Sequence, residues 1–211
     1  MLEARDLCFS YRKGHPILKE VSLALHQGQV RGISGPSGGG KSTLGRLLAG
    51  YLVPDSGAVL LDGASLGQGW CPVQYVHQNA LASVDPRWRI GRIVEEGWEP
   101  DEEAREAAGV SRHWYDRYPH EVSGGELQRV ALLRALSPQT RYLVADELTA
   151  MLDPVTQAGI WRFLLGRRDQ GLGILAISHD HALLARLTAS LHVMNQATLD
   201  HAASPPNRDA A

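Results

Sequence analysis

Nine residues in the first quarter of the chain have the types and spacing that bind a polyphosphate. The stretch 35–43 reads GPSGGGKST and fits G-x-x-x-x-G-K-[ST] at every fixed position. Glycines allow close approach of the main chain and φ > 0, so that backbone N–H groups can surround phosphate oxygens. A flexible glycine turn would not need Lys-Ser at that offset. The stretch therefore predicts a nucleoside triphosphate site.

Each residue of this loop has an expected task. Lys41 should reach the β- and γ-phosphates, and the Ser42 hydroxyl should ligate Mg²⁺. The expected nucleotide contacts in the loop are Gly35, Ser37, Gly38, Gly39, Gly40, Lys41, Ser42 and Thr43.

The elements that must position the loop are visible on either side of it. Residues 29–34 read as a short strand that runs into the loop. Leu44, Leu47 and Leu48 recur at helical spacing, which predicts a helix from about Lys41 to near Gly50. The N-terminus of that helix would add its dipole to the phosphate site.

Two acids follow an apolar strand later in the chain, in residues 141–147. In phosphate-loop enzymes such a strand lies beside the loop strand, and its first acid, here Asp146, holds Mg²⁺ directly or through water. Glu147 would then orient or deprotonate the attacking water. ATP with Mg²⁺ is the expected substrate pair.

Two more strands end in polar residues. The strand 73–78 ends at Gln78, whose amide could reach the metal or the attacking water, although a lone Gln at a strand end is most often solvated. The strand 173–180 ends in His179. Because ligands of open α/β sheets bind at the carboxyl ends of strands, His179 is expected to contact the γ-phosphate.

A second candidate anion site opens a helix at Ser123-Gly124-Gly125-Glu126. A helix N-terminus with Ser and two glycines can bind an anion, or Ser123 can simply cap the helix. Both interpretations remain open on the residues alone. Two such sites far apart in one chain would be explained by a dimer.

The N-terminal part, residues 2–34, alternates short apolar runs with turns and predicts antiparallel strands before the loop. Tyr11 follows the first of these runs. Its ring is either a partly buried strand-end aromatic or a face on which adenine stacks, and the residues alone do not choose.

Residues 79–122 change to helix-like patterning and predict a small helical insertion. Seven acids fall between Glu95 and Glu106, and Trp88, Trp98 and Trp114 lie in the same segment. The acidic run is expected to be a solvated helix face, and the aromatics could serve a partner surface.

Composition excludes several classes of protein. The net charge of −2 gives no basic field for nucleic acid. There is no run of about 18 apolar residues and no signal-peptide pattern, so the chain is not expected to cross a membrane by itself. Cys8 and Cys71 lack metal-type spacing and are expected to remain reduced in a cytosolic setting.

Taken together, residues 2–195 resemble the nucleotide-binding subunit of an ATP-binding cassette (ABC) transporter. The phosphate loop is similar to the Walker A motif of that family, 122–126 to its signature motif, and 143–147 to its Walker B motif with the catalytic glutamate. Other matches are the adenine-stacking aromatic Tyr11, the Q-loop Gln78, the D-loop Leu152-Asp153 and the switch histidine His179. Chemically, the resemblance implies that Glu147, His179 and Gln78 are catalytic and that Ser42, Gln78 and Asp146 hold the metal.

The resemblance also implies an assembly. Two homologous ATPase subunits would close head to tail, with ATP between Lys41 of one and Ser123 to Glu126 of the other, and Asp153 would link the two sites. Permeases in the membrane and an extracytoplasmic substrate-binding protein would complete the importer, so this subunit would lie on the cytoplasmic face. The runs 82–87 and 115–120 resemble importers of oligopeptides, dipeptides, nickel and metallophores. A non-transport ABC-type ATPase, for example in phosphonate breakdown, and a regulatory subunit with little hydrolysis are the alternatives.

Three departures from the family pattern are present. Glu126 replaces the usual Gln, Leu148 the usual Pro, and Ala150-Met151 the usual Ser-Ala before Leu152. The expected fold is α/β, a phosphate-loop NTPase core of mixed sheet with parallel core strands and antiparallel N-terminal strands, plus a small helical subdomain. Residues 1–78 and 123–199 should form the core, 79–122 the helical subdomain and 200–211 a flexible tail.

Overall fold

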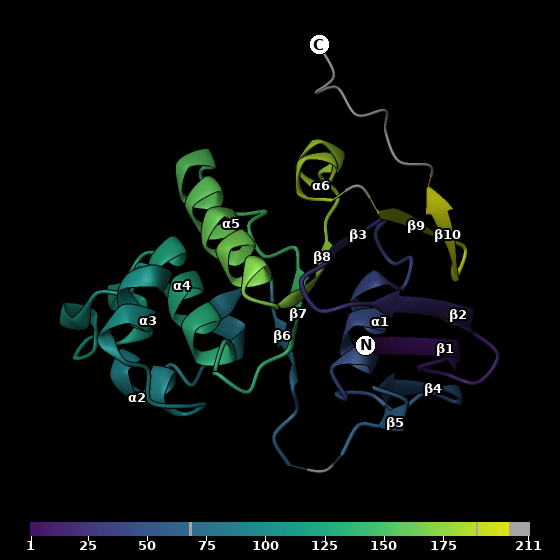
Figure 1. Cartoon of the computed structure of the whole chain (residues 1–211), viewed down its shortest axis with the longest axis horizontal. Coiled ribbons are helices and arrows are strands. Elements are labelled where there is room, and N and C mark those ends of the chain that lie inside the picture. Colours follow the sequence, from purple (N-terminus) through teal and green to yellow (C-terminus); the bar gives the residue numbers. More distant parts are fainter. Residues whose placement is uncertain (68, 189, 203–211) are drawn as a thin grey trace.

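The computed structural model describes residues 1–67, 69–188 and 190–202 of the chain, which fold into two sheets and a set of helices (Figure 1). The strands are β1 (Leu2–Phe9), β2 (Leu18–Leu25), β3 (Val30–Ser34), β4 (Ser56–Leu61), β5 (Ala64–Ser65), β6 (Val73–Val76), β7 (Tyr142–Asp146), β8 (Gly173–Ile177), β9 (Leu191–Asn195) and β10 (Thr198–Ala202). The α-helices are α1 (Lys41–Leu48), α2 (Ile90–Glu95), α3 (Glu102–Ala108), α4 (Gly124–Ala135), α5 (Pro154–Asp169) and α6 (His181–Leu187). Short 3-10 helices cover Ala80–Ser83, Arg112–Trp114 and Pro119–Glu121.

The larger sheet has six strands in the order β10-β9-β3-β8-β7-β6. Strands β9, β3, β8, β7 and β6 run parallel, and β10 pairs antiparallel with β9. The expectation that the Asp146 strand lies beside the loop strand is wrong, because β8 lies between β3 and β7. All five residues of β8 are buried. A strand that is apolar throughout is most stable in the middle of a sheet, with a neighbouring strand on each edge and helices over both faces.

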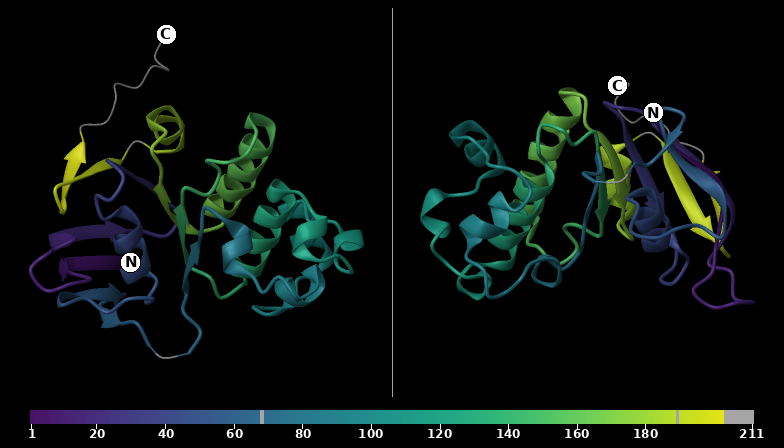
Figure 2. Two further views of the ribbon diagram at one scale, coloured as in Figure 1. Left: turned by 180° about the vertical axis from the view of Figure 1, so that it is seen from behind. Right: turned by 90° about the horizontal axis from the view of Figure 1, so that it is seen from below.

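The smaller sheet has four antiparallel strands in the order β2-β1-β4-β5. The expected antiparallel strands before the loop are therefore present, but they form a sheet of their own with β4 and β5. Helix α1 contacts β1 on one side and β6, β7 and β8 on the other, so it lies between the two sheets (Figure 2).

The core is divided by the larger sheet because neighbouring strand residues point to opposite faces. In β7, Tyr142 and Val144 join the apolar cluster around α1, whereas Leu143 and Ala145 join the cluster under α4, α5 and α6. The sheet thus carries α1 on one face and the longer helices on the other. The loop before α1 lies at the carboxyl edge of β3.

The helical segment lies at one end of the molecule, where α2 and α3 pack on α4 (Figure 1). All seven acids between Glu95 and Glu106 are exposed, which agrees with a solvated face. Trp114 is buried, and Trp88 and Trp98 are partly buried against the same core.

The end of the described chain differs from expectation. Strand β10 runs to Ala202, so residues 200–202 belong to the sheet edge, and 203–211, also expected to be tail, lie outside the described residues. Cys8 and Cys71 carry free thiols. Within the described ranges, no helix combines the length and apolarity that a membrane crossing needs.

Candidate functional site

The phosphate loop connects β3 to α1 as a glycine-dependent turn. Gly35 has φ +140° and Gly40 has φ +101°, both outside the range that L side chains commonly adopt. A Cβ at Gly35 would lie 2.2 Å from the carbonyl oxygen of Met194, and one at Gly40 would lie 2.8 Å from that of Ile17. Glycine is therefore required at both positions, which fixes the course of the loop into the helix.

Lys41 begins α1 and turns its ammonium back over the loop. Its Nζ donates hydrogen bonds to the carbonyl oxygens of Gly35 and Pro36, each at 2.9 Å. Only 5% of Lys41 is exposed. Burial lowers its pKa, and the nearby carboxylates of Glu147 and Asp146 partly oppose that effect. The loop thus holds a largely desolvated cation at its centre.

Tyr11 lies beside this loop and has an open ring. With Ile17 and residues 38–43 it lines a cavity of 250 Å³. Its hydroxyl lies 3.4 Å from Oγ1 of Thr43, its ring packs edge-on against Phe9, and 55% of the residue is exposed. Tyr11 is thus more exposed than a partly buried strand-end aromatic usually is, although one edge of its surroundings is the Phe9 ring, and both interpretations stay predictions.

The two acids lie where β7 ends. Asp146 is the last strand residue, and Glu147 follows with φ +50°, a left-handed conformation that costs roughly 1–2 kcal/mol for a side-chain-bearing residue. The backbone N–H of Glu147 donates to the carbonyl of Ile177, and Ser178 Oγ donates to Glu147 Oε2 at 3.4 Å. The strained turn is therefore tied to β8 and aims the Glu147 carboxylate across the sheet edge.

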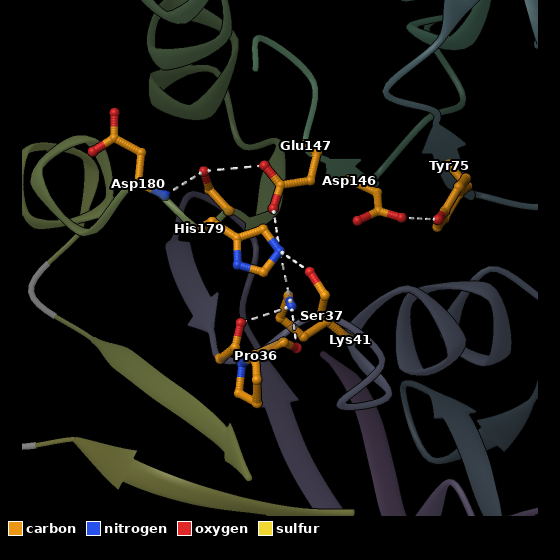
Figure 3. Close-up of polar contacts among 10 residues, drawn as sticks. Pro36, Ser37, Lys41, Tyr75, Asp146, Glu147, His179 and Asp180 are labelled. Carbon is orange, nitrogen blue, oxygen red and sulfur yellow. Dashed lines mark hydrogen bonds and ion pairs between the residues drawn. The ribbon is translucent and has the colours of Figure 1, made fainter. Parts of the chain in front are cut away.

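His179 follows β8 and lies between the loop and Glu147 (Figure 3). Its Nε2 is 3.4 Å from both Lys41 Nζ and Ser37 Oγ, and 3.5 Å from Glu147 Oε1. Because an ammonium group only donates, Nε2 of a neutral His179 accepts from Lys41 in this arrangement. The geometry brings together Lys41, Glu147 and His179, three residues that are far apart in the sequence.

The acids fit a magnesium ion. Asp146 Oδ1 and Glu147 Oε1 are buried and have no hydrogen-bond partner among the described residues. Mg²⁺ in nucleotide sites is held by one or two carboxylates with substrate phosphates rather than by a cage of protein ligands. The described part of the chain holds no group of three or more His, Cys, Asp or Glu that could bind a metal by itself.

Gln78 is not brought into this cluster. It is exposed just beyond β6, and its side chain makes no hydrogen bond to any residue that the structure describes. β6 is nevertheless the neighbour of β7 at the same sheet edge. Gln78 therefore lies at the rim of the site, free to turn toward it.

Ser123 and Glu126 form a reciprocal cap at the start of α4. Ser123 Oγ accepts from the Glu126 N–H at 3.3 Å, and Glu126 Oε2 accepts from the Ser123 N–H at 2.7 Å. Glu126, the departure from the family pattern, thus completes a capping box. Gly124 faces open space, whereas a Cβ on Gly125 would lie 2.8 Å from Thr156 Cγ2.

The two candidate anion sites are apart in one chain. Helix α4 lies with the helical segment on one side of β6, β7 and β8, and α1 lies on the other side (Figure 1). Asp153 is the N-cap of α5, with Oδ1 accepting from the N–H groups of Val155 and Thr156 at 3.0 Å each. Within one chain, Ser123 and Asp153 cap helices and do not reach the Lys41 loop.

Two residues of this region escaped sequence reasoning. Ser178 anchors Glu147, and Tyr75, on β6, donates a hydrogen bond from its hydroxyl to Asp146 Oδ2. The pKa of Tyr75 is raised by burial and by the Asp146 carboxylate, which keeps the hydroxyl protonated as a donor. The only signal in the sequence was a tyrosine among aliphatic strand residues.

This fold and this loop define a phosphate-loop nucleotide-binding protein, and comparison with known sequences gives the family. The ABC transporter family model matches residues 18–150, so the chain belongs to the ABC transporter family. It is 34% identical over 225 residues to the nickel import ATP-binding protein NikE of Rhodospirillum rubrum, covering 93% of this chain and 81% of NikE. It is 31% identical over 212 residues to the oligopeptide transport ATP-binding protein OppF of Haemophilus influenzae, covering 90% of this chain and 64% of OppF.

Relative length differs among these proteins. A relative from Brucella abortus is 35% identical over 197 residues, which are 83% of this chain and 59% of that protein. The chain thus spans about three fifths of some relatives and four fifths of NikE.

Solved structures confirm the fold. A dimeric ATP-binding cassette in a post-hydrolysis state with ADP and phosphate superposes with a TM-score of 0.80 at 23% identity, covering 94% of this chain and 96% of that one. The chain of a bacterial Atm1-family ABC exporter with ATP bound gives a TM-score of 0.82 at 25% identity, covering 96% of this chain and 38% of that one. The α/β fold with parallel and antiparallel strands is that of an ABC cassette.

Proposed function

We propose that this chain is the ATP-hydrolysing subunit of an ABC importer. The observation that carries the proposal is the convergence of Lys41, His179 and Glu147 at one sheet edge, with 3.4 to 3.5 Å between His179 Nε2 and its two neighbours. A triphosphate requires a cation, and its hydrolysis requires a base and a polar contact to the terminal phosphate. All three are supplied from β3–α1, β7 and β8.

Each residue then has a role. The loop N–H groups and Lys41 bind the phosphates, and the open ring of Tyr11 offers adenine a stacking face beside the 250 Å³ cavity. Ser42, Asp146 and Gln78 would hold Mg²⁺, which would supply positive charge against the phosphates. The buried Oε1 of Glu147, which lies 3.5 Å from His179 Nε2, accepts a proton from the attacking water, while Ser178 steadies the other oxygen. His179 contacts the γ-phosphate.

The working unit in this proposal is a pair of subunits. Since α4 lies across the sheet from α1, Ser123 to Glu126 serve the nucleotide of the partner, as a second copy or a homologous ATPase closes head to tail. The dimeric arrangement of a solved cassette of the same fold supports this. Gly124 agrees with it as well, because a position facing open space leaves room for an incoming phosphate.

The names of the relatives support a proposal for cargo and location. NikE and OppF are named for nickel import and oligopeptide transport, which supports a peptide, nickel or metal-metallophore chelate as the cargo. Permease subunits would hold this ATPase at the cytoplasmic face of the membrane, with an extracytoplasmic binding protein on the other side.

The test is Mg²⁺-dependent ATP hydrolysis by the purified full chain at several protein concentrations, repeated with Glu147→Gln. Specific activity should rise with concentration in the wild type. Turnover should fall by about 10²-fold or more in the variant, because the water loses its base. ATP affinity should be retained in that variant.

Two results would argue against the proposal. Unchanged turnover in Glu147→Gln would remove the base assignment. Absence of Mg²⁺-dependent ATP binding in the wild type would remove the function itself.

A further inference from the structure

Tyr75, in β6, contacts both the end of β7 and helix α1, two elements that carry expected metal ligands. It lies in β6, only 5% exposed, opposite Val144 of β7 in the parallel ladder. Its hydroxyl donates to Asp146 Oδ2, a buried hydrogen bond between residues 71 positions apart. A Tyr side chain thus reaches past its own ladder partner to the end of the neighbouring strand.

The ring of Tyr75 is held by α1. A Cβ on Gly45 would lie 2.9 Å from Cε2 of this ring, so the ring packs where that glycine leaves space. The ring of His77 meets it edge-on at 4.7 Å, and that of Tyr51 lies at 5.9 Å. Gly45 lies three residues, about one helical turn, after Ser42 in α1. Tyr75 therefore contacts the helix that carries one expected metal ligand, Ser42, and hydrogen-bonds to another, Asp146.

The hydrogen bond also divides the two oxygens of Asp146. Oδ2 is occupied by Tyr75, whereas Oδ1 is buried and has no partner in the described part of the chain. In Figure 3 the second oxygen of Asp146 points away from Tyr75, toward the side of Lys41 and His179. A buried carboxylate oxygen without a partner is costly unless an ion or water completes it.

We infer that Tyr75 is a positioning residue for the metal site: it fixes the Asp146 carboxylate so that Oδ1 alone faces the nucleotide-bound Mg²⁺. The inference rests on the proposed function and goes beyond it, because it names a residue that holds a ligand without touching metal or nucleotide. Outer hydrogen bonds to metal-binding carboxylates typically change metal affinity 10–100-fold when removed.

The chain offers a matched pair of variants for the test. Tyr75→Phe removes the bonded hydroxyl and keeps the ring against Gly45. Tyr142→Phe removes a hydroxyl from the same apolar cluster, at the other end of β7, where the buried oxygen has no partner. Both variants therefore lose a buried hydroxyl, but only Tyr75→Phe loses the contact with Asp146.

The measurement is the Mg²⁺ concentration that half-saturates binding of a hydrolysis-resistant ATP analogue to the full chain, with nucleotide binding in EDTA and thermal unfolding in parallel. Tyr75→Phe should raise that concentration about tenfold or more, with binding in EDTA unchanged and Tyr142→Phe equal to wild type. With Mn²⁺ in place of Mg²⁺, electron paramagnetic resonance of the bound ion should differ between wild type and Tyr75→Phe only.

A double-mutant cycle identifies the route of the effect. In an Asp146→Ala chain, which has no side-chain oxygen for Tyr75, the added Tyr75→Phe change should shift the Mg²⁺ requirement no further, since residues that act through one contact are not additive. Two outcomes would overturn the inference. One is that the shifts in Mg²⁺ requirement of the two single variants add up in the double variant. The other is that Tyr75→Phe has the same Mg²⁺ requirement as Tyr142→Phe. Tyr75→Met, which also lacks the hydroxyl and fills irregular space, replaces the Phe variant if that chain does not fold.

Failure of the proposed function gives a different result. A wild-type chain without Mg²⁺-dependent nucleotide binding would overturn both that function and this inference. If the wild type binds nucleotide in a Mg²⁺-dependent way and Tyr75→Phe has the same Mg²⁺ requirement, the inference would be overturned and the proposed function would stand.

Discussion

At the scale of single residues, the site depends on charges held out of water. Lys41 is a buried cation whose hydrogen-bond partners among the described residues are two loop carbonyls and the His179 imidazole, and its attraction to Glu147 and Asp146 offsets part of its desolvation. A phosphate in this position gains far more from such an ammonium than it would from one in water. The catalytic value of the residue therefore lies in its placement.

Replacement of Lys41 tests that placement. Lys41→Ala should lower ATP affinity or turnover by about 10²-fold or more, because the β- and γ-phosphates lose a preorganised cation. The exposed Arg112 of the helical segment provides the control, since Arg112→Ala removes a positive charge outside the loop and the cavity beside it. Equilibrium binding and steady-state hydrolysis are the measurements, and near-normal values in Lys41→Ala would contradict the site.

The second prediction for a single residue concerns the pH dependence of stability that His192 causes. It is 7% exposed in β9, with Arg31 Nη1 at 3.3 Å from its Nε2 and the His201 ring at 4.8 Å. Burial, Arg31 and His201 lower its pKa from 6.5 to about 4. The unfolded chain binds a proton below about pH 6.5 that the folded chain refuses until about pH 4, so stability falls as the pH falls through that window.

The loss from His192 should reach at most about 3 kcal/mol at pH 4. Thermal unfolding between pH 7.5 and 4.5 is the measurement, with His192→Gln as the comparison because its amide cannot titrate. The wild type should lose melting temperature more steeply than the variant. Parallel pH profiles would show that His192 is not the group responsible.

At the scale of elements, the site is built from strand ends and helix starts. Lys41 is the first residue of α1, and Ser123 and Asp153 are the N-caps of α4 and α5. The proposed function uses all three. A helix start carries unpaired N–H groups, which a side chain or an anion must satisfy. In α4 and α5 the side chains of Ser123 and Asp153 accept hydrogen bonds from these N–H groups. Mutations at the two helix starts can therefore test stability and nucleotide turnover separately.

The start of α4 permits such a separation at Gly124. A Cβ there meets nothing within 4 Å, so Gly124→Ala should stabilise the fold by up to about 1 kcal/mol. It should nevertheless lower ATP turnover, because the methyl group stands where the partner's phosphate approaches. Gly125→Ala, whose Cβ would lie 2.8 Å from Thr156 Cγ2, should lose stability and turnover together. Full turnover in a stable Gly124→Ala would mean that this helix start is only a cap.

Asp153 allows the same separation at α5. Asp153→Ala should cost about 1 kcal/mol of unfolding free energy, since two N–H groups lose their acceptor. Asp153→Asn keeps the accepting oxygen and should keep the stability. Chemical denaturation measures both, and an Asn variant as unstable as the Ala variant would show that the cap is not what Asp153 contributes.

At the scale of the whole molecule, the larger sheet separates the two anion sites. The Lys41 loop opens on the α1 side, and Ser123 to Glu126 start the helix on the opposite side (Figure 1). No internal rearrangement of side chains could bring both to one phosphate. In the proposed function, a second subunit rotated head to tail would supply what one chain cannot.

Mixing two inactive variants tests this composite site. Lys41→Ala and Gly124→Asp chains should each hydrolyse ATP poorly alone. In their heterodimer one site carries both defects and the other carries none, so an equimolar mixture should recover up to about a quarter of wild-type activity. No recovery at any concentration would mean that both motifs act on the same chain or that a different ATPase is required.

The sequence anticipated the local features and the family. The loop, the helix after it, the two acids at a strand end and the antiparallel strands before the loop depend on residues close together in the chain. The order β3-β8-β7 was not anticipated, because strand order reflects which apolar strand is covered on both faces and edges. Gln78, expected to end the strand 73–78, lies two residues beyond β6, and its direction depends on that loop.

What the sequence by itself determined is the chemistry available: a glycine loop with Lys41 and two acids at a strand end, in the order of an ABC cassette. What only the tertiary structure decided is which distant groups touch. Tyr75 meets Asp146 because β6 and β7 pair in one register and Gly45 leaves room for the ring. Local motifs follow from chain spacing, whereas contacts such as this depend on register, rotamer and packing at once, which no spacing encodes.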